Sequence, residues 1–185
     1  MSYSPYKNIY IKDYDPYCEE IAALRNLIIE DIKSNPRSRH VHMLDWFTES
    51  GWENKASRHT YTICSVIYDN KDNFIGMTTS IDVDNTLKVL VKYYLMSEYA
   101  VQYRGISQTD IIPHCVDYAR KKQMEYIWLT VHTFDKRHQR LSDSIKNKLN
   151  GSGIPREQMP YYEKWEYVGE IKFHSVMQDK FICEI

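Results

Sequence analysis

An arginine and a glycine stand directly before a run with helical spacing, in the segment YAVQYRGIS (residues 99–107). The first turn of a helix has amides without intrahelical partners and the positive end of the helix dipole, so it attracts anions. Gly105 allows close approach to the backbone, Arg104 adds a positive charge, and Ser107 and Thr109 add hydroxyls. These residues predict a phosphate-binding loop; a turn glycine beside a surface arginine is the alternative.

Cysteine and histidine are the other reactive side chains in the chain. The four cysteines are scattered without a CxxC pair, which favours reduced, buried thiols over a zinc site: Cys18, Cys64, Cys115 and Cys183. His40 and His42 form an RHVH pair, and His132 and His138 follow later, but no third ligand stands at a suitable spacing. We therefore expect no metal site.

Length and composition limit the class of protein. With 185 residues, 43% of them hydrophobic and 26% charged, we expect a single folded domain over residues 1–185. A formal net charge of -1 gives no overall electrostatic case for nucleic acid or an anionic membrane. No apolar run approaches the roughly 20 residues of a membrane span, and the N-terminus does not resemble a signal peptide. These features favour a cytoplasmic protein that does not bind membranes.

The elements predicted before the loop are a helix and several strands. Residues 8–15 predict a short strand, and residues 17–35 have apolar side chains at helical spacing. Two alternating segments around the turn NKDN predict a hairpin over residues 60–83, and residues 87–101 predict a third antiparallel strand. Residues 37–59 predict a short helix with loops, whose Trp46, Phe47 and Trp52 are interpreted either as an aromatic pocket wall or as core.

After the loop, residues 107–123 again show helical spacing. The apolar run over residues 126–134 predicts a buried strand parallel to the strand before the loop, because a helical crossover separates the two. A basic helix over residues 136–150 and a short helix over residues 155–165 follow, and a hairpin turning at MQD (residues 177–179) is predicted to close the chain.

The order of these elements resembles the GCN5-related N-acetyltransferase (GNAT) superfamily over nearly the whole chain. YAVQYRGIS is similar to that family's V-x-P-x-Y-R-G-x-G-x-G/A segment, which binds the pyrophosphate of acetyl-CoA. Tyr103, Arg104 and Gly105 match its Tyr-Arg-Gly, whereas Ser107 and Thr109 stand where Gly or Ala is usual. A register starting at Gln102 places the same loop on the phosphates.

The resemblance implies a set of acetyl-CoA contacts. The backbone near Tyr99 and Val101 would hold the pantetheine arm by strand-like hydrogen bonds, and the following loop would hold the diphosphate. The implied cofactor-binding residues are Tyr99, Val101, Arg104, Gly105, Ile106, Ser107, Gln108 and Thr109.

The resemblance also implies an acid and a base for acyl transfer. YYEKWEYVG is similar to the family's Y-E-K-x-G-F segment, so Tyr162 would protonate the departing CoA thiolate, although Glu166 stands where that pattern has Gly. On the strand before the loop, Tyr94, Met96 and Glu98 share one face by the period of two. Glu98 or a water would accept the proton of the amine.

The implied fold is α/β (α+β), with a central mixed, mostly antiparallel sheet flanked by helices and an inserted basic helix before the last hairpin. The implied reaction is transfer of an acetyl group from acetyl-CoA to a primary amine in a ternary complex. Helix 136–150 holds five Lys or Arg residues against one acid, so a nucleic-acid partner stays open. The alternatives are an enzyme of this fold that modifies nucleic-acid bases and a catalytically degenerate module that binds a protein or nucleic acid.

Overall fold

The computed structural model describes residues 8–35, 41–53, 60–132, 139, 142–143, 146, 165–173 and 176–185. Contacts between residues group the chain into two compact units. The first unit holds residues 1–81 and 90–111, and the second holds residues 82–89 and 112–185. Each unit has its own strands and helices, and the single domain over residues 1–185 stays a prediction.

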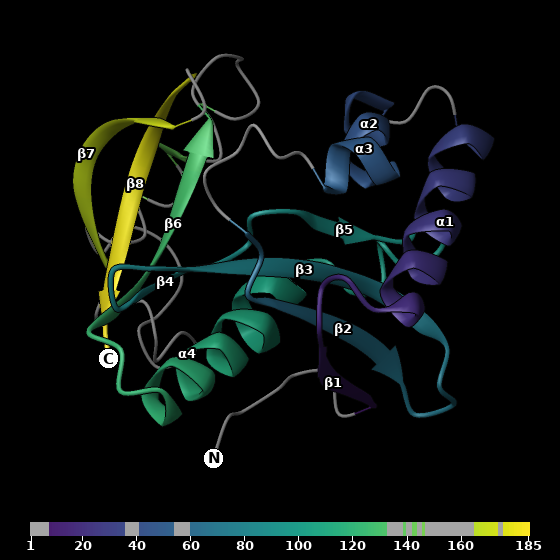
Figure 1. Cartoon of the computed structure of the whole chain (residues 1–185), viewed down its shortest axis with the longest axis horizontal. Helices are drawn as coiled ribbons and strands as arrows, with labels where there is room; N and C mark the ends of the chain where they lie inside the picture. Colours follow the sequence, from purple (N-terminus) through teal and green to yellow (C-terminus); the bar gives the residue numbers. More distant parts are fainter. Residues whose placement is uncertain are drawn as a thin grey trace. The chain divides into compact units, whose positions relative to one another are not determined.

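The first unit is built on antiparallel strands (Figure 1). β1 (Ile9–Tyr14) pairs with β2 (Ile63–Asp69), and β2 pairs with β3 (Phe74–Val83). β5 (Tyr93–Leu95) pairs with the other side of β3. A Cβ atom on Gly76 would lie 2.3 Å from the carbonyl oxygen of Tyr94, so β3 needs a glycine where β5 passes it. The predicted opening strand and hairpin are confirmed.

The helices of the first unit bury their apolar stripe against these strands. In α1 (Glu19–Ser34) the buried residues Ile21, Ile28 and Ile32 follow the predicted helical spacing. They share one core cluster with side chains of β2, β3 and β5. The segment after α1 contains η1 (Val41–Met43), α2 (Leu44–Phe47) and α3 (Glu49–Trp52). Phe47 and Trp52 are buried, which assigns both to the core rather than to a pocket wall.

In the second unit the predicted parallel pair is present for the first residues of the strand predicted over residues 87–101. β4 (Thr86–Lys88) runs parallel to β6 (Tyr126–His132), which pairs with β8 (Val176–Glu184), and β8 pairs with β7 (Trp165–Phe173). The prediction for the last turn is wrong: residues 177–179 lie within β8, and the hairpin turns between Phe173 and Val176. Gln178 and Asp179 suggested a turn because they are polar, but both are buried.

The helix that follows the candidate loop begins irregularly and ends regularly. A π-helical turn, η2 (Ser107–Ile111), leads into α4 (Ile112–Lys121). Gln123 has a φ of +56°, and the amides of Gln123 and Met124 each donate at 3.0 Å, to the carbonyls of Arg120 and Ala119. This pair of hydrogen bonds is a Schellman motif, which ends a helix. The predicted helix over residues 107–123 is therefore confirmed.

The predicted third strand over residues 87–101 is divided in the structure. The Val89 amide donates to Trp128 at 2.8 Å, whereas the Val91 amide donates to Thr79 at 2.9 Å. Between them Leu90 has a φ of +56°, a left-handed conformation that costs a leucine on the order of 1–2 kcal/mol. The backbone therefore changes its hydrogen-bonding partner from β6 to β3 at Leu90. Only β4 and β5 remain as strands.

The strands hydrogen-bond in the order β1-β2-β3-β4-β6-β8-β7, with β5 paired to β3. The predicted fold class, a mixed and mostly antiparallel sheet with flanking helices, is confirmed. Cys64, Cys115 and Cys183 are buried free thiols, and Cys18 is a half-buried one, which agrees with the prediction of reduced cysteines. None of the described helices has both the length and the apolar character required to cross a membrane.

Candidate functional site

The candidate phosphate loop, residues 99–109, is a series of tight turns in the first unit. The Tyr103 amide donates to the Tyr99 carbonyl at 3.0 Å, and the Ile106 amide donates to the Tyr103 carbonyl at 3.1 Å. The side chains of Tyr103 and Ile106 are buried, whereas Arg104 between them is exposed. The buried side chains fix the loop on both sides of Arg104 and leave its guanidinium at the surface.

Gly105 has the conformation and the open space that a backbone anion site requires. Its φ is +92°, and a Cβ atom added there would meet nothing within 4 Å. Its carbonyl accepts from the amides of Gln108 at 2.9 Å and Thr109 at 3.2 Å, so it begins the helix. The glycine is therefore needed for its backbone conformation, and the space beside it lets a ligand approach the first helical turn.

Thr109 is a poorer ligand donor than the sequence suggests. Its hydroxyl donates at 2.5 Å to the carboxylate of Asp110, and its amide already bonds Gly105. Asp110 is 9% exposed and places a negative charge in the first turn of the helix, where it competes with a bound anion. Ser107 is half-buried, and in the described loop its amide makes no such turn bond. Ser107 is the stronger candidate of the two.

The expected strand-like backbone at Tyr99 and Val101 is wrong. The Tyr99 amide donates to the Met96 carbonyl at 2.9 Å, and the Tyr99 carbonyl accepts from Tyr103. Val101 lies in a turn with 88% of its side chain exposed. Because the backbone groups of Tyr99 close turns within the loop, they cannot continue a strand ladder to a ligand. Contacts of either residue with a pantetheine arm stay a prediction.

Glu98 is also placed differently from its prediction. β5 ends at Leu95, and Glu98 lies exposed in the following turn, so it does not share a strand face with the buried Tyr94. The chain leaves the strand because the amide of Ser97 donates at 2.8 Å to the carboxylate of Asp31 on α1. The role of Glu98 as a base is not tested by this placement and stays a prediction.

Asp31 anchors the segment that leads into the candidate phosphate loop. One oxygen of its carboxylate accepts from the Tyr94 hydroxyl at 2.8 Å, the Ser97 amide at 2.8 Å and the Ser97 hydroxyl at 2.9 Å. Burial, followed by the hydrogen bond to Asp31, raises the pKa of Tyr94 above its ordinary value, so the phenol stays a donor. Sequence reasoning missed Asp31, because an acid on an amphipathic helix is usually solvent-facing.

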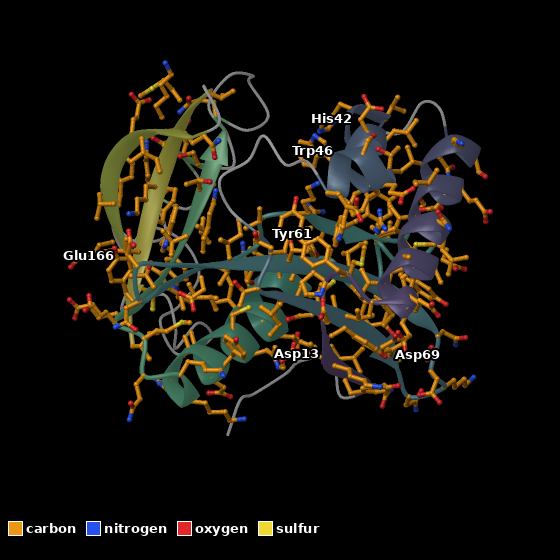
Figure 2. All side chains as sticks on the ribbon, viewed as in Figure 1. Asp13, His42, Trp46, Tyr61, Asp69 and Glu166 are labelled. Atoms are coloured by element: carbon orange, nitrogen blue, oxygen red, sulfur yellow. The ribbon has the colours of Figure 1, made fainter. Side chains whose placement is uncertain are left out.

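Two cations fix the short helices α2 and α3. The ammonium of Lys92 donates to the carbonyls of Trp46 at 2.7 Å and Gly51 at 2.8 Å. The guanidinium of Arg25 donates to the carbonyl of Phe47 at 3.2 Å. Carbonyls at the end of a short helix have no intrahelical donors, so cations stabilise them. Figure 2 shows Trp46 beside His42, and their rings meet edge to face at 5.8 Å.

Lys92 is buried in this packing. It is 9% exposed, and its ammonium lies 5.2 Å from the ring centres of both Trp52 and Tyr61. Burial, and secondarily the charge of Arg25, lowers its pKa to about 8. Sequence reasoning missed Lys92 as well, since a lysine between apolar strand residues suggests an exposed position. Its ammonium therefore contributes to the fold rather than to a ligand site.

Several predicted site residues lie outside the described residues. They include Tyr162, His40, His138 and most of the basic helix over residues 136–150. Within that helix Lys146 is described, and its ammonium pairs with Asp179 at 2.9 Å. Asp179 is 1% exposed and also accepts from the hydroxyls of Ser142 and Tyr167. Among the described residues, no group of three or more His, Cys, Asp or Glu side chains is arranged to hold a metal ion.

Comparison with solved structures defines the fold. The PaiA N-acetyltransferase of Thermoplasma acidophilum, in complex with coenzyme A, superposes with a TM-score of 0.56 at 13% identity, covering 96% of this chain and 99% of that chain. A putative GNAT-family acetyltransferase of Desulfovibrio desulfuricans has a TM-score of 0.56 at 9% identity, covering 95% of this chain and 98% of that chain. The chain has the GNAT fold.

A further GNAT-fold structure extends the comparison to a polyamine enzyme. A chimera of the Vibrio cholerae spermidine N-acetyltransferase SpeG and hSSAT has a TM-score of 0.52 at 11% identity, covering 96% of each chain. No family model matches the sequence, and no curated protein matches it. At identities this low, the GNAT likeness establishes how the chain folds.

Proposed function

We propose that this protein is an N-acetyltransferase that moves an acetyl group from acetyl-CoA to a primary amine within a ternary complex. Residues 104–107 would hold the diphosphate of the cofactor. The fold supports this proposal, since a CoA complex is among the structures that superpose over nearly the full length of both chains. The proposed acceptor is a primary amine, and no particular amine is named.

The observation that carries the proposal is the geometry around Gly105. A positive φ, an open Cα and an exposed arginine occur together at the start of a helical segment. Each feature alone is common, but together they supply amide donors, a positive charge and room for an anion. The residues present therefore fit a diphosphate, and Arg104, Gly105 and Ser107 would be its contacts.

In the proposed reaction the acceptor nitrogen attacks the thioester carbonyl, so a carbon–nitrogen bond forms as the carbon–sulfur bond breaks. Tyr162 would give a proton to the departing thiolate, and Glu98 or a water would take a proton from the amine. Glu98→Gln separates the two bases. A fall in kcat of about 100-fold assigns the proton to Glu98, and an unchanged kcat assigns it to water.

The experiment that tests the proposal is isothermal titration of the full chain with acetyl-CoA. We expect saturable binding in the wild type and about 100-fold weaker binding in Arg104→Glu, which exchanges attraction for repulsion. Lys71→Glu, in the exposed β2–β3 turn, makes the same charge reversal away from the loop and is expected to bind like wild type. A folded wild type without binding would overturn the proposal.

A catalytically degenerate GNAT-fold module is the second candidate, and the chemistry of Asp110 favours it. Its carboxylate lies in the first helical turn and accepts a hydrogen bond from the hydroxyl of Thr109. The loop therefore has fewer hydrogen-bond donors for a ligand than its sequence suggests. The same titration separates the candidates, because the degenerate module would not bind acetyl-CoA. Five cations in residues 136–150 suggested a nucleic-acid partner. One of them, Lys146, is already paired with Asp179.

A further inference from the structure

The stretch that leads into the candidate phosphate loop is not held by burial. No residue from 97 to 102 is buried, and the first buried side chain after β5 belongs to Tyr103. The amide of Met96 still donates at 2.9 Å to the carbonyl of Ile75 on β3, and beyond Met96 the chain forms turns. A stretch with few buried side chains depends on hydrogen bonds for its conformation.

Asp31 provides the hydrogen bonds at the start of this stretch. Its Oδ2 atom accepts from the amide and the hydroxyl of Ser97 and from the hydroxyl of Tyr94. Figure 1 shows α1, which carries Asp31, beside the end of β5. All three donors are neutral, so the charge of the carboxylate strengthens each bond. One acid on α1 thus fixes a residue of β5 and the first residue of the turn.

The helix itself does not explain an acid at residue 31. Asp31 lies in the last turn of α1, where the negative end of the helix dipole disfavours a carboxylate. Its neighbour Glu30 is exposed to solvent, whereas Asp31 is half-buried and bonded to Ser97. The contacts with Ser97 and Tyr94 therefore account for the carboxylate at this position.

A series of turn hydrogen bonds connects the start of the loop to its end. The amides of Tyr99, Tyr103 and Ile106 each donate, at 2.9 to 3.1 Å, to a carbonyl three or four residues earlier in the chain. Successive turns share Tyr99 and Tyr103, so the geometry of each turn constrains the next. The last of these bonds encloses Arg104 and Gly105, which would face the diphosphate.

We propose that Asp31 is a positioning residue for the candidate phosphate loop: by fixing Ser97, it holds Gly105 and Ile106 in the conformation that binds an anion. The identity of the ligand rests on the proposed function, and the proposal adds that a residue of α1 controls the loop. Asp31 would act through Ser97 rather than by touching the ligand. Both residues and the whole loop belong to the first unit.

The first test is amide hydrogen exchange of the full chain without ligand. Asp31→Ala removes the carboxylate, and the control Glu30→Ala removes an exposed carboxylate from the adjacent position of the same helix. In Asp31→Ala we expect the amides of Tyr103 and Ile106 to exchange about tenfold faster, because the loop opens locally more often. The amide of Val66, in β2, should keep its wild-type rate. Glu30→Ala should leave all of these rates unchanged.

Further variants show whether Asp31 acts through Ser97. Ser97→Ala removes one of the three donors and keeps the backbone amide, so we expect about threefold faster exchange of the loop amides. In the Asp31→Ala background the same change should add nothing. Asp31→Asn keeps an acceptor oxygen without the charge, and its exchange rates should lie between those of wild type and Asp31→Ala. If the alanine variant does not fold, Asp31→Asn takes its place.

The second test is titration of the same variants with acetyl-CoA under conditions in which each variant is folded. Asp31→Ala is expected to bind about tenfold more weakly, because a smaller fraction of its loops has the binding conformation. Glu30→Ala is expected to bind like wild type. A residue that only stabilised the fold would leave the affinity of the folded chain unchanged.

The proposal is overturned if the loop amides of Asp31→Ala exchange as in wild type, or if the exchange of Val66 accelerates by the same factor. It is also overturned if the effects of Ser97→Ala and Asp31→Ala are additive, or if wild type and Asp31→Ala bind acetyl-CoA equally well. A wild type that does not bind acetyl-CoA contradicts the proposed function, and the exchange measurements then decide by themselves whether Asp31 positions the loop.

Discussion

Lys92 and Arg104 belong to one stretch of the first unit, yet their surroundings differ in every respect. Lys92 is 9% exposed, and its ammonium bonds two backbone carbonyls of the segment that contains α2 and α3. Arg104 is exposed on a turn, beside a glycine with open space at its Cα. Lys92 is therefore buried within the fold, whereas Arg104 stands at a surface that an anion can reach.

The comparison shows how to separate a structural cation from a ligand-binding one. A buried cation that satisfies helix-end carbonyls stabilises the fold, and its removal leaves those carbonyls without donors. An exposed arginine is expected to cost less stability to replace than a buried lysine, because its side chain keeps contact with water in the folded state. Substitution of Lys92 is therefore expected to lower stability, whereas substitution of Arg104 is expected to weaken ligand binding with little change in stability.

The largest effect on stability is expected for Lys92→Met. The change removes two short hydrogen bonds to carbonyls and one charge from between aromatic rings, so unfolding free energy should fall by about 2–4 kcal/mol. Urea denaturation measures this as a lower midpoint. Lys71→Met, in an exposed turn, should leave the midpoint unchanged. A Lys92→Met midpoint equal to that of wild type would show that the comparison is wrong.

A smaller effect is expected for Gly105→Ala. Because the φ of Gly105 is +92°, alanine there should cost about 1–2 kcal/mol of stability and narrow the approach to the helix start. Gly169, in the β7 bulge, has a φ of +107° and equally open surroundings, so Gly169→Ala is a matched control. Both variants should lose similar stability, and only Gly105→Ala should weaken acetyl-CoA binding. Equal affinities would place the cofactor elsewhere.

The pH dependence of stability provides a third comparison. The pKa of Lys92 is lowered from 10.5 to about 8, so between these values the unfolded chain binds more protons than the folded one. Stability should therefore rise as pH increases from about 8 towards 10. Lys92→Met removes this contribution and should flatten the rise measured by urea denaturation at each pH. A wild-type curve with the same slope as the variant would contradict the lowered pKa.

The smallest effect on stability is expected for Arg104→Met, within about 0.5 kcal/mol of wild type. Its binding of acetyl-CoA should nevertheless fall by about tenfold, because a charged donor to the diphosphate is lost. Thermal unfolding and titration calorimetry on the same samples measure both quantities. A strong loss of stability would mean that Arg104, like Lys92, belongs to the fold.

Local sequence patterns predicted most of the elements and the position of the loop. The apolar spacing of α1 and the alternation of β2 and β3 are set by burial of one face, which a sequence displays directly. The helix after Gly105 and the parallel strand β6 followed from the same rules. These features depend on neighbours close in sequence, so they were accessible without a structure.

What the sequence did not predict depends on distant partners. The break at Leu90 needs a left-handed leucine, which no local preference suggests. Glu98 leaves the strand because Asp31, on α1, binds Ser97. Gln178 and Asp179 are polar, yet both lie buried in β8. In each case a tertiary contact outweighs the local pattern, and these errors concern the residues around the candidate site.

The most direct test of the candidate phosphate loop is a backbone amide NMR titration of the full chain with acetyl-CoA. We expect the amide signals of Gly105, Ile106 and Ser107 to show the largest shifts and to saturate together. We expect the amide signal of Lys92 to shift little, because that residue stabilises the fold. Saturable binding that leaves the amides of residues 104–109 unshifted would contradict the assignment of this loop as the diphosphate site.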